Sequence, residues 1–533
     1  MKKLTSFNKI KQMKRIIVFL SIGLAALSFS ACDKDYEKTN TDPIGIIRTS
    51  PDKLLSPALV NVLAANMGRN RSFNNELMQV TVTQSEDEFA IFRYDFRPSV
   101  ADATWNAWYS ELTNIRDIFS IASMPAYQND SYKGISLVLE AWVFQLLTDT
   151  YGDVPYKDAN KGMEGLVEPA FDKQKDIYLG LLEKLEQANT LLSTGTPIVA
   201  TSDPLYHGDT NLWRKLSNSL RLRLLLRISG KSEVAAEVIE KIRQIAETPA
   251  EFPVFSSNEE SAVFKWNGTI VTTDPLTNPF VTSLRELDFV IPSLCNFFIV
   301  RLHSWNDPRL DITTTYGNGT RNSLGIAQGP AGFAGIESGY APGGGGETKQ
   351  SYFYSYSNSD FSIQKNPLAG GTIMSYAELQ FILAEAAAKG WITTGTAESY
   401  YYKGIAAGIN FWVPKFPTDI TNPAFTAYIA GAQGTEWNNT LPLDQATGDS
   451  KMERIHLQKY YSLFLNDFQQ WFEYRRTGHP VLPKGAGLKN GGIMPARMNY
   501  PVYVQTTNPT NYGKAIINMG GDAINTQVWW QKP

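Results

Sequence analysis

The sequence predicts a mainly α-helical protein made of paired helices and long loops. After residue 51, apolar residues recur every three to four positions over much of the chain, which places them on one face of a helix. Two such segments, 376–390 and 397–413, are joined by a short turn and must fold back on each other. Between residues 248 and 375 the helical spacing fades and glycine becomes frequent. We therefore expect a helical scaffold with one loop-rich insertion.

The first 31 residues predict a secretory signal peptide that is removed. Lys14 and Arg15 precede Ile16–Phe29, a run of 14 residues without charge. This run is shorter than the roughly 20 residues that a membrane-spanning helix needs. A buried N-terminal core helix is the alternative interpretation, and translation could start at Met1 or Met13.

Small residues and a cysteine follow this run. Ser30-Ala31-Cys32 resembles the cleavage box of bacterial lipoproteins, in which the cysteine becomes the lipidated N-terminus. We expect acyl chains on Cys32 to anchor the protein in a membrane that it does not span. Residues 32–51 are polar and lack periodicity, so they predict a flexible tether. Its acidic start, Asp33-Lys34-Asp35, resembles the tags that direct lipoproteins of the Bacteroidetes to the cell exterior.

Helices are predicted in chain order through the rest of the protein. Apolar residues at 177, 181, 185, 188 and 192 share one face, whereas 137–150 is apolar nearly all round and predicts a helix buried on both sides. We expect helices at 52–68, 73–85, 104–122, 137–150, 176–193, 211–229, 232–247, 376–390, 397–413 and 452–476.

The pair at 376–413 resembles a tetratricopeptide repeat. Small alanines keep its first helix slim, Gly390 ends it, and Ala397 lies four residues before Tyr401 in the second helix. The other helices do not recur at a fixed 34-residue period. We therefore expect an α-α superhelix of degenerate helix pairs, interrupted by insertions, within one domain at 52–533.

Charge and composition exclude several classes of protein. Residues 1–31 carry six basic and no acidic side chains, which leaves 43 basic and 52 acidic residues and a net charge of −9 for the rest. An acidic body without a basic patch argues against nucleic-acid binding. With 12 Trp, 25 Tyr and 27 Phe and only 19% charged residues, the chain is not a disordered one.

Motifs for catalysis, metals and cofactors are missing from the sequence. It has no zinc-protease, nucleophile-elbow, phosphate-loop or dinucleotide-binding motif, and its four histidines are scattered. Cys295 lies alone in an apolar run, which is typical of a buried residue. Asp149 and Asp153 could form the carboxylate pair of a glycoside hydrolase, although their positions also suit the capping of a helix end. We expect no cofactor and no metal ligands, and whether calcium binds stays open.

The aromatic residues of the loops are the candidates for ligand binding. Flat rings stack on the apolar faces of sugars, and nearby polar side chains can bond to sugar hydroxyls. Residues 317–346 contain 11 glycines, and aromatic side chains flank them. The candidate carbohydrate-binding residues are Trp305, Tyr316, Tyr340, Tyr352 and Tyr354, with Phe92 and Tyr94 from an earlier segment.

Six strings along the chain are informative when they are taken together and in order. They are NTDP from Asn40, TWNAWYSELTNIRDI from Thr104, TDTYGDVPY from Thr148, LQFILAEAAAKGW from Leu379, LFLNDFQQWFEYRRTGHP from Leu463 and PARMNYPVYVQTTNPTNY from Pro495. Together they resemble the SusD/RagB family of outer-membrane nutrient-binding lipoproteins, in particular its second SusD-like branch.

This resemblance implies four tetratricopeptide-like helix pairs, with loops and minor β elements on the ligand side. It also implies a non-enzymatic protein that captures glycans, or peptides in some members, as a hinged lid on a SusC-like, TonB-dependent transporter. A surface glycosidase and a purely structural subunit are the alternatives. The ligand positions of the family vary, so none is transferred to this chain.

Overall fold

The computed structural model describes residues 49–85, 89–343, 348–357 and 359–532. The chain divides into two units, Met1–Thr49 and Ser50–Pro533. The predicted signal peptide, Cys32 and the tether as far as residue 48 lie outside the described residues. All the described residues except Thr49 belong to the second unit.

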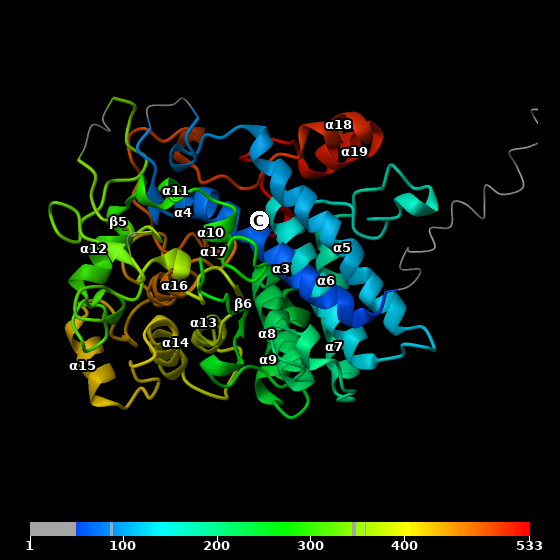
Figure 1. Cartoon of the computed structure of the whole chain (residues 1–533), viewed down its shortest axis with the longest axis horizontal. Helices are drawn as coiled ribbons and strands as arrows, with labels where there is room; N and C mark the ends of the chain where they lie inside the picture. The colour runs from blue at the N-terminus through cyan, green and yellow to red at the C-terminus, as the bar shows by residue number, and fades with distance from the viewer. Residues whose placement is uncertain (1–48, 86–88, 344–347, 358, 533) are drawn as a thin grey trace, which may run out of the picture. The chain divides into compact units, whose positions relative to one another are not determined.

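The second unit is mainly helical, which confirms the predicted fold class. In its first half, long helices pack in chain order, each on the next (Figure 1). These helices are α3 (Pro51–Arg69), α5 (Asp102–Ala122), α6 (Asp130–Tyr151), α7 (Gln174–Leu192), α8 (Thr210–Ile228) and α9 (Ala235–Glu247). As its composition predicts, α6 is buried along nearly its whole length.

The predicted helical hairpin is formed by α13 (Tyr376–Ala388) and α14 (Ala397–Trp412). Gly390 follows α13 in the left-handed region, with φ 72°, where glycine carries no steric penalty. The two helices approach closely at Gly404, where an added Cβ would lie 2.7 Å from the ring of Phe381. α16 (Lys451–Ser462) packs against both helices, and α13 also contacts α8, which joins the hairpin to the first half.

Two of the predicted helices are wrong in part. Residues 73–85 contain the end of a π-helix (Asn70–Asn74) and α4 (Asn75–Leu77), and then β1 (Thr81–Val82) pairs with a distant strand. The segment 452–476 is broken into α16 and α17 (Gln469–Thr477). Between them, Leu465 and Asp467 adopt positive φ values of 62° and 31°, which a continuous helix does not allow.

Between residues 248 and 375, the described segments form only short helices and strands. Within this region β2 (Ala262–Val263) pairs with β6 (Thr372–Met374), and β4 (Ile326–Ala327) pairs with β5 (Tyr352–Phe353), both antiparallel. Its β3 (Ser293–Leu294) pairs with β1, which comes much earlier in the chain. The insertion also contains α10 (Pro279–Thr282), α11 (Leu287–Val290) and α12 (Asn296–Ser304). Three helices that the sequence analysis did not predict come later in the chain, α15 (Pro423–Gly431), α18 (Val502–Thr507) and α19 (Pro509–Met519).

Among the described residues, the helices are either too short or too polar to cross a bilayer.

Buried ion pairs join the helices at the centre of the unit. The carboxylate of Glu473 on α17 accepts hydrogen bonds from Arg227 on α8 at 2.9 Å, Lys459 on α16 at 2.8 Å and Arg476 at 2.9 Å. Arg476 also forms a bidentate pair with Glu385 on α13, at 2.9 and 2.7 Å. Burial alone would raise the pKa of Glu473, but these cations hold it well below its ordinary value. We call Arg227, Glu385, Lys459, Glu473 and Arg476 the ion cluster.

We expect Glu473→Gln to lower the free energy of unfolding by about 3–5 kcal/mol, because three buried cations lose their shared carboxylate. Chemical denaturation monitored by circular dichroism measures the change. The control is Glu237→Gln on α9, where the glutamate side chain is 68% exposed and pairs with Lys241 at 2.7 Å. An exposed pair contributes little, so this control should change stability by less than about 0.5 kcal/mol. Equal effects of the two substitutions would contradict the role of the cluster.

His479 joins α16 to the loop that precedes it. Its Nδ1 lies 2.7 Å from Glu453 and its Nε2 lies 2.8 Å from Asp444, while the ring of His456 stacks beside it at 6.2 Å. Burial disfavours the charge on His479, but the bonds to the two carboxylates outweigh it and raise its pKa above the ordinary 6.5.

Because the pKa of His479 is higher in the folded state, protonation of this histidine stabilises the fold. The contribution is complete below the unfolded-state pKa of about 6.5 and is lost as the pH rises through the folded-state pKa. We therefore expect His479→Gln to lower the melting temperature most at pH 6 and progressively less towards pH 9. Thermal melts at matched ionic strength measure the difference. A gap that widens with rising pH would contradict the assignment.

Candidate functional site

The tyrosines around β5 form the aromatic surface that best fits a ligand site. Residues 351, 353 and 355 are buried, whereas Tyr352, Tyr354 and Tyr356 are half-buried, which is the alternation of an extended segment with one face inward. The rings of Tyr352 and Tyr354 lie 6.4 Å apart and are inclined by 64°. We call Tyr352, Tyr354 and Tyr356 the tyrosine face.

The inward side of β5 holds the tyrosine face in place. Phe353 is 3% exposed and stacks on Phe464 at 6.0 Å with an interplanar angle of 13°. The strand pairs with β4 through Phe353 and Tyr352, and the backbone N–H of Tyr354 donates to Gly325 at 2.8 Å. The orientation of the outward tyrosines therefore depends on packing beneath them.

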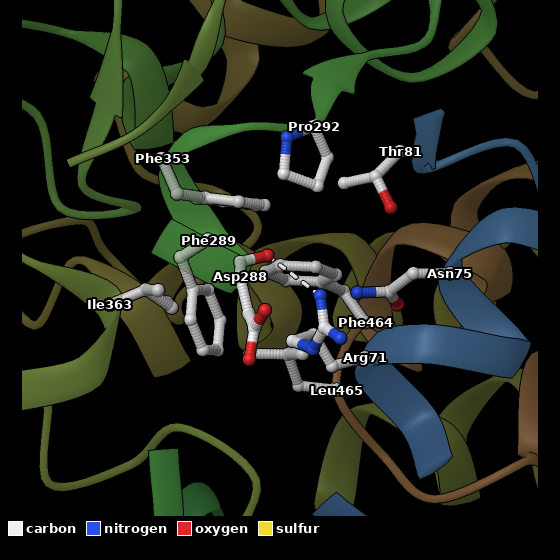
Figure 2. A pocket seen from close by; sticks show the side chains of 10 residues that line it. All are labelled: Arg71, Asn75, Thr81, Asp288, Phe289, Pro292, Phe353, Ile363, Phe464 and Leu465. Atoms are coloured by element: carbon white, nitrogen blue, oxygen red, sulfur yellow. Dashed lines mark hydrogen bonds between the residues drawn. The ribbon is translucent and has the colours of Figure 1, made fainter. Parts of the chain in front are cut away.

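A cavity lies beneath this segment, and Figure 2 shows Phe353, Phe289 and Phe464 around it. Arg71 reaches into it from the π-helix and donates from Nη1 to the carbonyl of Asp288 at 2.6 Å (Figure 2). The cavity volume is about 10 Å³, which has room for one water molecule at most. It is a packing defect behind the tyrosine face and is too small for a sugar.

Two cations lie over the tyrosine rings. The Nζ of Lys349 is 3.7 Å from the ring centroid of Tyr352, and the guanidinium carbon of Arg321 is 4.0 Å from that of Tyr354. Both distances are within the range of cation–π attraction. Burial lowers the pKa of Lys349, because it disfavours the charged form of the amine. Sequence reasoning missed both cations, because nothing in their spacing relates them to these rings.

The other predicted binding residues lie elsewhere. Phe92 and Tyr94 are 1% and 4% exposed, so their rings are inside the protein. Tyr340 is half-buried and stacks on Phe92 at 5.1 Å, with its hydroxyl accepting from the N–H of Ser85 at 3.0 Å. These residues pack the loops against each other, which leaves Phe92 and Tyr94 no open face for stacking.

Trp305 and Tyr316 are also engaged by the protein. The Trp305 side chain is 5% exposed, packs on Tyr461 at 5.4 Å and donates from Nε1 to the carbonyl of Gln433 at 3.0 Å. Tyr316 is half-buried, with its ring 5.6 Å from that of Phe416. Among the seven predicted aromatic residues, the ring of Tyr352 lies beside that of Tyr354, and the ring of Phe92 lies beside that of Tyr340.

The carboxylate pair considered for a hydrolase is not accessible. Asp149 is fully buried and accepts hydrogen bonds from Gln145, Tyr178, Arg227 and Trp530 at 2.5 to 2.8 Å. A glycan therefore cannot reach this carboxylate without disrupting the core.

Chemistry at other residues is equally constrained. The Cys295 thiol is free but buried, and burial raises its pKa well above the ordinary value, so the reactive thiolate is suppressed. Within the part of the chain that the structure describes, no three His, Cys, Asp or Glu side chains form a group that could hold a metal ion.

Comparison with known proteins identifies the family. A SusD-like family model described as "Starch-binding associating with outer membrane" matches residues 43–501. The chain belongs to this SusD-like family. The resemblance stated from the six sequence strings is thereby confirmed. A comparison with curated proteins found no match.

Solved structures share the fold over nearly the whole chain. A SusD homologue from Bacteroides fragilis is 24% identical, with a TM-score of 0.69, and covers 91% of this chain and 100% of its own. A chitin-binding SusD homologue from Flavobacterium johnsoniae is 20% identical, with a TM-score of 0.71 and coverages of 90% and 98%. A SusD-like protein from Bacteroides thetaiotaomicron is 21% identical, with a TM-score of 0.68, and the match covers 90% of this chain and 98% of that protein. At this identity the likeness supports the SusD-like fold.

We expect Phe353→Ala to lower the free energy of unfolding by about 3–5 kcal/mol, because it leaves a cavity where a buried ring stacked on Phe464. The matched control is Phe361→Ala, which removes the same ring at a side chain that is 40% exposed. Chemical denaturation of both variants measures the difference. If Phe353→Ala and Phe361→Ala lowered the free energy of unfolding by similar amounts, the packing beneath the tyrosine face would not be what holds that face in place.

Proposed function

We propose that this protein is a cell-surface lipoprotein that binds nutrient glycans and delivers them to a SusC-like, TonB-dependent transporter. The observation that carries the proposal is the tyrosine face, which presents Tyr352 and Tyr354 side by side over a rigidly packed strand. The starch-binding description of the SusD-like family and the chitin-binding relative support a glycan as the ligand class.

The tyrosine face suits binding without chemistry. Aromatic rings bury the apolar face of a sugar and tolerate different linkages, while hydroxyl and amide groups nearby give orientation. Ser357 lies exposed on the same segment, and its hydroxyl, which donates to Glu286, can accept a hydrogen bond from a sugar. A bound glycan can leave intact, which is what delivery to a transporter requires.

The membrane and transporter roles rest on the sequence and the family. Lipidation of Cys32 would hold the domain at the outer membrane, and the tether at 32–51 would let it move over a barrel. The protein in this proposal has no enzymatic activity, and the burial of Asp149 argues against the hydrolase alternative. A peptide-binding role is the second candidate, because cations beside aromatic rings also suit acidic peptides.

We expect Tyr352→Ala and Tyr354→Ala each to weaken the binding of a glycan by about fivefold to tenfold, since one stacked ring contributes roughly 1 kcal/mol. Isothermal titration with chitin and starch oligosaccharides measures the affinity. The control is Tyr503→Ala, which removes a side chain that is 42% exposed. Its helix, α18, lies apart from β5 in Figure 1.

Unchanged affinity of both tyrosine variants for a glycan that binds the unmodified protein would refute this site. Binding of peptides, with no glycan bound, would favour the second candidate.

A further inference from the structure

A pocket of about 510 Å³ lies between the end of α12 and the start of α16, apart from the residues that make up the tyrosine face. This volume is within the range of ligand pockets and can hold a short oligosaccharide. Its apolar walls include Trp305 and Leu457, and its charged lining residues are Arg301, Asp449 and Glu453.

Both carboxylates of the pocket already have partners. Asp449 accepts three hydrogen bonds from Arg454, at 2.9, 3.1 and 2.6 Å. Glu453 accepts from Nδ1 of His479 at 2.7 Å and from the N–H of Val481 at 3.0 Å. These contacts brace the pocket and leave neither acid free to hold a cation of a ligand.

Arg301, in contrast to these two carboxylates, has no such partner in the part of the chain that the structure describes. Among the described residues, its side chain forms no ion pair and no hydrogen bond, and its Nη1 is buried without a partner. Its guanidinium packs on the ring of Phe297 at 4.4 Å, which holds the planar group without using its N–H donors. Within the same described ranges, its Nε and Nη2 also lack a partner and are not buried, so these are the donors that a ligand in the pocket can reach.

We propose that this pocket binds the carboxylate of an acidic sugar residue through Arg301. The guanidinium matches a carboxylate with two parallel hydrogen bonds, which a neutral hydroxyl cannot reproduce. Leu457, which is half-buried, contacts the apolar side of the same residue. The choice of a saccharide rests on the proposed function, whereas the choice of a carboxylate rests on Arg301.

The test compares two ligands with the same sugar backbone, one with charged carboxylates and one with neutral methyl esters. A trimer of galacturonic acid and its fully methyl-esterified form are titrated calorimetrically into the full chain. We expect the acid form to bind at least tenfold more tightly, with a preference that weakens as salt rises. Arg301→Gln should abolish the preference. Arg301→Lys should retain part of it, because lysine keeps the positive charge and loses the paired N–H donors of the guanidinium.

Several outcomes would overturn the proposal. They are equal affinity for the two forms, no binding of the acid form, and a preference for the acid that survives in Arg301→Gln. Because Arg301 is half-buried, thermal melts verify that each variant is folded.

The Tyr352→Ala variant separates this pocket from the tyrosine face. If the pocket proposal holds, this variant keeps the preference for the acid form over its ester. If neutral glycans bind the unmodified protein and Tyr352→Ala with equal affinity while Arg301→Gln loses the acid preference, the tyrosine site fails and the pocket stands. Loss of neutral glycan binding in Tyr352→Ala, with no acid preference in the unmodified protein, gives the reverse result.

Discussion

The structure depends on charged side chains that can be buried only if several helices meet at once. Glu473 and Arg476 on α17 need Arg227 from α8, Lys459 from α16 and Glu385 from α13. Each of these groups would be costly in the interior without its partners. The ion cluster therefore favours the arrangement of these four helices in which all its charges are paired.

This arrangement extends to the loops that carry the candidate site. Phe464 comes shortly after α16, and its ring stacks on Phe353 of β5. Trp412 at the end of α14 contacts the ring of Phe464 at 5.8 Å. A helix end set by the ion cluster thus positions the strand whose outer side is the tyrosine face. The insertion needs little secondary structure of its own, because its aromatic residues anchor it to the scaffold.

The helical scaffold could be predicted because periodicity is a local property. The hairpin of α13 and α14 and the buried α6 follow from spacing, alanine content and end signals within each segment. The break between α16 and α17 could not be predicted, because Leu465 and Asp467 adopt positive φ within a pattern that continues at helical spacing. The strand at 81–82 was missed for a similar reason, since its partner lies more than 200 residues away.

The candidate site shows more clearly that amino-acid composition alone does not predict which residues bind a ligand. Aromatic residues in loops suggested a binding surface, yet the rings of Phe92, Tyr94 and Trp305 are almost fully buried. A long insertion without regular structure must bury apolar rings to pay for its order, so an aromatic-rich loop is first of all a small core. The alternation in 351–356, in contrast, marks three tyrosines that are half-buried between buried neighbours. Binding surfaces in such loops are therefore better sought in period-two patterns than in aromatic counts.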